Sequence, residues 1–151
     1  MASTKKILTS LHGKLVGVSA DGKLTVKGRT IRAMDDTGCE ILLQPTPATQ
    51  NATGTLTAAQ LKTGIITSTT AAAVAATVPT GTLLDASFSG DDALLVGEGF
   101  DWAVIVTGAN ALTVTAGTGH TLVGNAVVPT ATSGRFRSVK TAANTFVTYR
   151  L

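Results

Sequence analysis

The stretch Phe100-Asp101-Trp102-Ala103-Val104-Ile105-Val106-Thr107 decides the fold class, because large apolar side chains stand at every second position. Successive side chains of an extended strand point to opposite faces of the sheet. The even-numbered residues from Phe100 to Val106 therefore share one face. This alternation predicts a strand with one side in the core.

Similar short runs fill residues 56–151, with turn signals about every eight to ten residues. Threonine, a residue that suits strands, occupies 27 of the 151 positions. The sequence predicts a mainly β fold, as an antiparallel β-sandwich or a jelly-roll-like barrel. No internal repeat stands out. The expected strands cover residues 65–68, 74–78, 100–107, 112–116, 121–123, 126–128, 135–139 and 145–151.

Turn residues and alternation give three finer expectations for the C-terminal part. Gly124-Asn125 is a two-residue hairpin signal, and Ala143-Asn144 lies near a second turn. Val147, Tyr149 and Leu151 share a face, so we expect the last strand to turn this face toward the core.

Two short helices are expected within the β pattern. Thr57 and Gln60 form a capping box, and Leu56 and Leu61 stand at the positions of a hydrophobic staple. With Gly64 as the terminating residue, these signals predict a helix over 58–63. A second helix is expected over 83–88, with Thr82 as its N-cap.

The first third of the chain differs in composition. Residues 1–44 are expected to hold an extended arm and a small β unit, because residues 23–27 alternate cleanly and turn signals surround them. Residues 45–55 are rich in proline and threonine and are expected to be a linker. Residues 56–151 are then the main β domain.

The charges are few and unevenly placed. Charged residues make up 14% of the chain and the net charge is +3, with the basic excess in residues 1–44. No aromatic residues interleave with these basic residues, so we expect a protein contact rather than direct binding of nucleic acid. No run is long enough for a membrane span, and residues 1–11 lack the apolar core of a signal peptide.

Residue types that support catalysis are scarce. The chain has two histidines and one cysteine, and no cluster of His, Cys and acids is apparent. We expect no enzymatic activity, no cofactor and no metal. The lone Cys39 excludes an internal disulfide and is interpreted as a small buried residue. The acidic stretch 91–101 could serve glycoside chemistry or calcium binding, but we interpret it as a solvated loop.

Several segments resemble virion proteins of tailed bacteriophages, in particular small capsid decoration (cement) proteins and head-fibre-like proteins. The resemblance covers about two thirds of the chain and adds no catalytic residues. The segments that carry it are Leu56-Thr57-Ala58-Ala59-Gln60-Leu61 with Gly64-Ile65-Ile66, the run from Phe100 to Val114, Ala116-Gly117-Thr118-Gly119 with Thr121-Leu122-Val123-Gly124, Ser133-Gly134-Arg135-Phe136-Arg137, Tyr149-Arg150-Leu151, and Lys6-Ile7-Leu8-Thr9-Ser10-Leu11-His12-Gly13.

The resemblance implies a structural protein made in the host cytoplasm and placed on the exterior of the capsid in the virion. Its partner would be the major capsid protein, whose neighbouring subunits it would cement. Such proteins are often homotrimers and sometimes dimers, and the low charge of this chain also favours self-association. The alternative is a fibre domain that binds a receptor or glycan. Trp102 and Tyr149 lie in strand patterns that look buried, which favours cement over glycan binding.

Six residues are the candidates for the contact with the capsid or a neighbouring subunit. Arg135 and Arg137 flank Phe136 on one face of a strand and could hold a carboxylate. The other four lie in the basic N-terminal segment, which could reach a neighbour as an extended arm and add a strand to a sheet edge. They are Lys5, Lys6, His12 and Lys14.

Overall fold

The computed structural model describes residues 16–18, 24–26, 29–30, 44–90 and 93–151. The chain divides into two compact units, Met1–Leu43 and Gln44–Leu151. The described part of the first unit is an antiparallel sheet with the strand order β1-β2-β3. Its strands are β1 (Val16–Val18), β2 (Leu24–Val26) and β3 (Arg29–Thr30).

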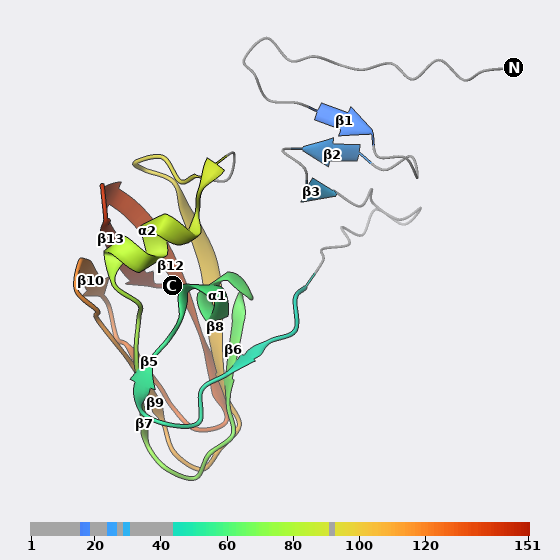
Figure 1. Cartoon of the computed structure of the whole chain (residues 1–151). Coiled ribbons are helices and arrows are strands. Elements are labelled where there is room, and N and C mark those ends of the chain that lie inside the picture. Colours follow the sequence, from blue (N-terminus) through green and yellow to red (C-terminus); the bar gives the residue numbers. More distant parts are fainter. Residues whose placement is uncertain (1–15, 19–23, 27–28, 31–43, 91–92) are drawn as a thin grey trace, which may run out of the picture. The chain divides into compact units, whose positions relative to one another are not determined.

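The second unit is built from two sheets, so the expected mainly β fold is confirmed (Figure 1). The six-stranded sheet has the order β10-β13-β12-β8-β6-β4, and the four-stranded sheet has the order β11-β9-β7-β5. The strands are β4 (Ala48–Thr49), β5 (Gly54–Thr55), β6 (Ile65–Ser68), β7 (Val74–Thr77), β8 (Gly99–Val106), β9 (Leu112–Thr115), β10 (His120–Val123), β11 (Val127–Val128), β12 (Thr132–Ala142) and β13 (Thr145–Arg150).

The chain crosses from the six-stranded to the four-stranded sheet after β4, β6 and β8, which gives stacked coils as in a solenoid. Strands β4, β6 and β8 run parallel in one sheet, and β5, β7 and β9 run parallel in the other. The expected antiparallel arrangement is therefore found only in part, because β8, β12 and β13 are antiparallel neighbours whereas the strands of the coils are parallel. Residues 45–55, which we expected to be a linker, contain β4 and β5 and form the first coil.

The second and third coils are a structural repeat that the sequence pattern did not reveal. Val104 lies beside Ile66, and Val114 lies beside Ala76, an offset of 38 residues in both sheets. The two segments share alternation and turn length, whereas most of their paired residues differ, which explains why no repeat stood out. Threonines recur at equivalent positions, and the hydroxyls of Thr77 and Thr115 are 2.8 Å apart in a hydrogen bond.

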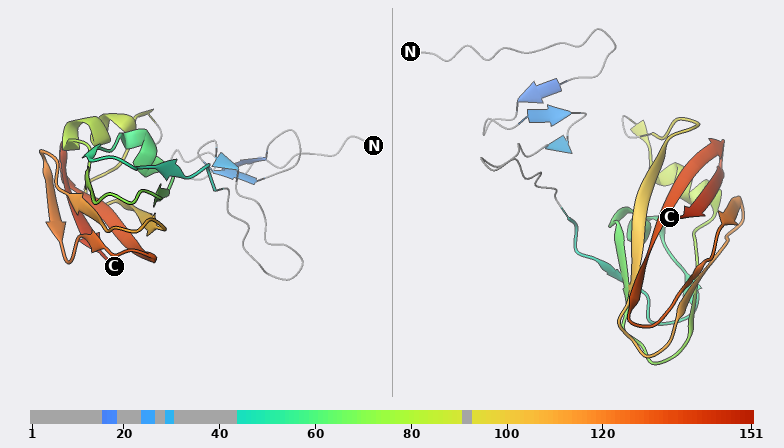
Figure 2. Two further views of the ribbon diagram at one scale, coloured as in Figure 1. Left: turned by 90° about the horizontal axis from the view of Figure 1, so that it is seen from below. Right: turned by 180° about the vertical axis from the view of Figure 1, so that it is seen from behind.

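Both helices lie in connections that return from the four-stranded to the six-stranded sheet. They are α1 (Ala58–Lys62) and α2 (Gly81–Ser87). Figure 1 shows the short turns of the coils gathered at one end of the strands and the helices toward the other. The helices stay side by side in the turned view of Figure 2, and they contact each other. Their buried residues Leu61 and Leu84 close the core at this end.

The capping box predicted for α1 is confirmed. Thr57 accepts a hydrogen bond from the backbone of Gln60, whose side chain in turn accepts from the Thr57 backbone. The N-cap predicted for α2 is wrong, because the helix begins earlier and Thr80 caps it. A side chain at Gly81 would collide with the backbone of Asn144, so only glycine allows the helix to start there.

The C-terminal strands give one confirmed hairpin and one correction. β12 and β13 are antiparallel neighbours, and Asn144 between them has a φ of 56°. The hairpin expected at Gly124-Asn125 is absent from the described structure, because β10 pairs with β13 and β11 pairs with β9 in the other sheet. The chain thus changes sheets at Gly124, whose φ is +97°.

Aromatic residues and a short chain of hydrogen bonds fill the space between the sheets. Trp102 stacks on Phe136 with ring centroids 4.6 Å apart. The Trp102 indole nitrogen donates to the Ser138 hydroxyl at 3.0 Å, and the Ser138 and Thr148 hydroxyls are 2.9 Å apart. All three polar groups are buried. The pairing satisfies polar atoms that would otherwise weaken the core.

The last strand turns its other face inward, contrary to expectation. Phe146 and Thr148 are buried, whereas Tyr149 and Leu151 are exposed. The reason is the register with β12, which places Thr148 opposite the buried Ser138. Alternation alone cannot decide which of two mixed faces is inside.

We expect Ser138→Ala to lower the free energy of unfolding by about 1–3 kcal/mol, because it leaves two buried groups without a partner. Ser133→Ala is the matched control, since Ser133 is an exposed serine of the same strand. Urea unfolding followed by the fluorescence of Trp102 measures both. Equal stability of the two variants would show that the buried hydrogen bonds contribute nothing net.

His120 gives the fold a pH-sensitive position. Its ring stacks on Phe146 at 5.4 Å between centroids, and both ring nitrogens are buried without a hydrogen-bond partner among the described residues. Burial lowers the pKa of His120 below its ordinary value of 6.5. The folded state therefore resists protonation that the unfolded chain accepts.

We expect the free energy of unfolding to fall as the pH drops below 6.5, because the unfolded chain then binds more protons at His120. Above this pH both states are neutral at this residue, and the effect disappears. His120→Gln should flatten this part of a stability–pH curve. His12→Gln is the control, since the chain has only two histidines. A slope that disappears in the His12 variant instead would contradict the assignment.

Candidate interaction surface

The six-stranded sheet has one face toward the core and one face away from it, which we call the outer face. Strand register places its residues in rows across four strands. One row runs Val123, Tyr149, Arg137, Asp101, and the next runs Thr121, Val147, Val139, Gly99. Arg135 lies in a third row beside Ala103 and Ile65. Apolar, aromatic and charged groups are thus brought together on one face of the sheet.

Arg135, Arg137 and Asp101 form an ion cluster on the outer face. The Arg137 guanidinium donates to both carboxylate oxygens of Asp101, at 2.6 and 2.8 Å. Arg135 makes only a long contact with one of the same oxygens, at 3.4 Å. The hydrogen bond from Arg137 lowers the pKa of Asp101 and raises the pKa of Arg137. The cluster carries a net charge of one unit positive.

The charged groups of the cluster remain accessible. The side chains of Arg135 and Arg137 are 69% and 52% exposed, and that of Asp101 is 33% exposed. An ion pair this exposed contributes little to stability, because solvent screens it. The fold therefore does not depend on the arginines, and they are available to other molecules.

Apolar residues surround the cluster. Tyr149 is 39% exposed and lies beside Arg137, so the expectation that Tyr149 is buried is wrong, whereas Trp102 is buried as expected. Val123 and Leu151 are also exposed. Tyrosine and arginine are enriched at the energetic centres of protein interfaces.

A recess adjoins the cluster at the end of the outer face near the loop 93–98. Its lining consists of Gly97, Gly99, Phe100, Asp101, Arg137 and Val139. The loop exposes Leu95 and Val96, which directly precede the lining residue Gly97 in the chain. The recess therefore combines a polar wall with apolar neighbours.

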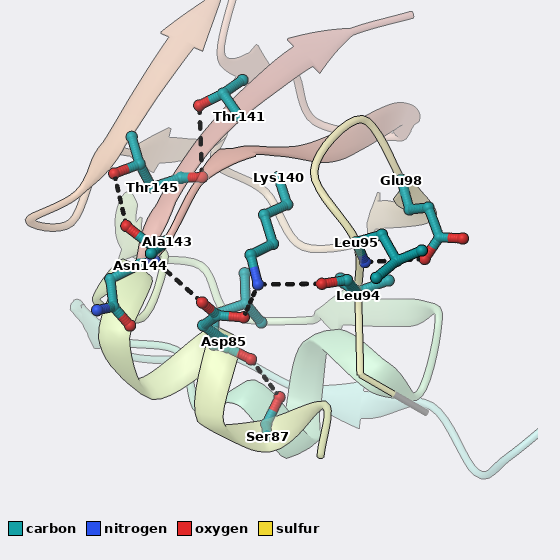
Figure 3. A network of polar contacts seen from close by, with 11 residues as sticks. Asp85, Ser87, Leu94, Leu95, Glu98, Lys140, Thr141, Ala143, Asn144 and Thr145 are labelled. Atoms are coloured by element: carbon teal, nitrogen blue, oxygen red, sulfur yellow. Dashed lines mark hydrogen bonds and ion pairs between the residues drawn. The ribbon is translucent and has the colours of Figure 1, made fainter. Parts of the chain in front are cut away.

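A network of polar contacts anchors this loop (Figure 3). The Lys140 ammonium forms an ion pair with Asp85 at 2.6 Å and donates to the backbone oxygen of Leu94 at 3.0 Å. Glu98 closes the turn by accepting from the Leu95 backbone. Asp85 also accepts from the Asn144 backbone. Helix α2, the loop and the β12–β13 turn are thus tied to one another beside the outer face.

The structure brings together only part of the predicted contact residues. Arg135 and Arg137 share a face, as predicted, and hold a carboxylate of their own chain. Lys5, Lys6, His12 and Lys14 lie outside the described residues, as do Cys39 and the arm over residues 1–11.

Sequence reasoning missed Asp101 and Tyr149 as parts of this surface. Asp101 ends the acidic stretch that we interpreted as a solvated loop, although the predicted strand 100–107 also contains it, and the structure places it in β8. The available signal was the alternation itself. Asp101 directly precedes Trp102, so its carboxylate points to the face of the strand that lies away from the core. Tyr149 gave no such signal, since only the register with β12 fixes its direction.

Two further features are absent from the described residues. No group of three or more His, Cys, Asp and Glu residues comes together there in a way that could hold a metal ion. Within the same residues, neither helix has the length and apolar character needed to cross a membrane.

Comparison with known proteins gives no match for the chain, whether with family models, with curated proteins or with solved structures.

Asp85 and Asp101 offer a matched test of the two ion pairs. We expect Asp85→Asn to lower the free energy of unfolding by about 2 kcal/mol, because it removes a charge-assisted hydrogen bond from the poorly exposed Lys140. Asp101→Asn, the same change in the exposed pair, should cost clearly less, because solvent screens that pair. Denaturant unfolding at pH 7 measures both.

The pH dependence provides a second readout of the same pair. The hydrogen bond from Lys140 lowers the pKa of Asp85 below 3.8, so its stabilisation is complete above pH 3.8 and is lost as the pH falls through the folded value. The difference between wild type and Asp85→Asn should shrink in this acidic range. A difference that stays constant down to pH 2 would show that the ionised form is not what stabilises the fold.

Proposed function

We propose that this chain is a structural virion protein that binds the exterior of a bacteriophage capsid and cements neighbouring subunits of the major capsid protein. In this proposal the outer face of the six-stranded sheet is the docking surface. The observation that carries it is the row Val123, Tyr149, Arg137, Asp101, in which aromatic, aliphatic and arginine side chains lie exposed side by side on one face of the sheet.

The construction of the domain supports a docking role. Cross-strand pairs and the stacked coils place the surface residues on regular strands rather than on long loops. Residues held this way lose little conformational freedom when a partner binds. Arg135 and Arg137 were also the two described residues that the sequence indicated for a subunit contact. The resemblance to decoration proteins then names the partner.

The alternative is a fibre domain that binds a receptor or glycan, and one observation favours it. Tyr149 is exposed, and an exposed aromatic ring is the group that stacks on sugars. Arg137 and Val123 flank this ring on either side in the same row. This mixture of charge and aliphatic surface is more typical of a protein contact.

Binding to capsids tests the proposal directly. We expect the full chain to cosediment with purified capsids that lack it, and Tyr149→Ala to weaken binding at least about tenfold if the ring is a central contact. Thr113→Ala is the control, because Thr113 lies on the outward side of the other sheet. Electron microscopy of decorated capsids should show the protein on the outer surface.

The alternative predicts a different outcome. Binding to a glycan array, with loss in Tyr149→Ala and no cosedimentation with capsids, would replace the cement function by the fibre function. Unchanged capsid binding by Tyr149→Ala would move the docking surface away from this face.

A further inference from the structure

We propose that the cluster of Arg135, Arg137 and Asp101 binds a carboxylate, supplied by an acidic segment of the partner protein. This inference rests on the proposed function for the identity of the partner, which would be the capsid subunit. The carboxylate-binding property itself follows from the geometry of the cluster. It names the chemistry that the docking surface recognises.

The unequal distances in the cluster show which arginine is available. Arg137 occupies both oxygens of Asp101 at hydrogen-bond distances of 2.6 and 2.8 Å. The contact of Arg135 at 3.4 Å is directed to an oxygen that Arg137 already holds. A guanidinium has five N–H donors in a planar fork, and a long contact uses one of them. Arg135 therefore retains donors for a second carboxylate.

The charge of the cluster selects the sign of the partner. Two arginines against one aspartate leave one positive charge, and Arg135 is the most exposed of the three side chains. A lysine or arginine from a partner would meet Asp101 only after displacing Arg137. An acid can join the cluster without breaking any contact, and the result is a neutral set of two arginines and two carboxylates.

The surroundings of the cluster specify the partner segment further. Tyr149 and Val123 continue the row beyond Arg137, and Leu151, just after the end of β13, donates its backbone N–H to the backbone oxygen of Arg135. An acidic residue flanked by apolar residues would satisfy both parts of this surface. Burial of the flanking groups would exclude water and strengthen the ion pair.

Three variants test the chemistry on purified capsids. Arg135→Ala should weaken binding at least about tenfold, since it removes charge-assisted hydrogen bonds. Asp101→Asn should strengthen binding, because it releases Arg137 for the partner's carboxylate. Lys62→Ala is the control, as it removes a cation on α1 that donates to the backbone oxygen of Ser87 and lies over the ring of Phe88. Thermal unfolding verifies that each variant is folded.

A small probe separates this inference from the proposed function. We expect an acetylated and amidated hexaglutamate peptide to shift the NMR signals of the Arg135 and Arg137 side chains at millimolar concentration, and a hexalysine peptide not to do so. Asp101→Asn should bind hexaglutamate more tightly and Arg135→Ala more weakly.

The outcomes are distinct. Hexaglutamate binding at the cluster without any capsid binding would retain the carboxylate site and overturn the proposed function. Capsid binding that is unaffected by Arg135→Ala and Asp101→Asn, together with no response to hexaglutamate, would retain the function and overturn the carboxylate site. Tighter binding of hexalysine than of hexaglutamate would also overturn it.

Discussion

The parallel pairing of β6 with β8 and of β7 with β9 is the constraint on which the rest of the structure depends. Both pairs have the same 38-residue offset, so the turns between the sheets must have equal length. The connections that return from the four-stranded to the six-stranded sheet must also span the distance between the sheets. They contain α1 and α2, whose buried residues Leu61 and Leu84 close the core. Each coil then adds one strand to each sheet, and the main chains satisfy one another's hydrogen bonds.

The sequence carried the local features of this fold but not the long-range ones. The strand that contains Trp102, the capping box of Thr57 and the turn at Asn144 depend on neighbouring residues, and each was predictable. The parallel order and the repeat depend on pairs of segments far apart in the chain. Two coils with the same alternation but mostly different residues leave little identity for a sequence comparison within the chain to find.

The candidate surface likewise has residues that the sequence could place and residues that only the strand register could place. Arg135 and Arg137 could be placed on one face from their spacing alone, and a carboxylate partner was a reasonable hypothesis. The antiparallel register of β8 and β12 is what identifies Asp101 as the carboxylate that these arginines contact. Tyr149 was misplaced because Val147 and Tyr149 alternate with Phe146 and Thr148, and a threonine can be buried when Ser138 satisfies its hydroxyl.

The two ion pairs beside the outer face show how stability and recognition are separated. Lys140 and Asp85 are poorly exposed, tie together α2, the loop 93–98 and β12, and serve the fold. Arg135 and Arg137 are well exposed, and their contact with Asp101 contributes little to stability. Because the anchoring charges lie behind the surface, the arginines in front of it can exchange partners without loosening the strands that carry them. This arrangement is consistent with the docking role that we propose for the outer face.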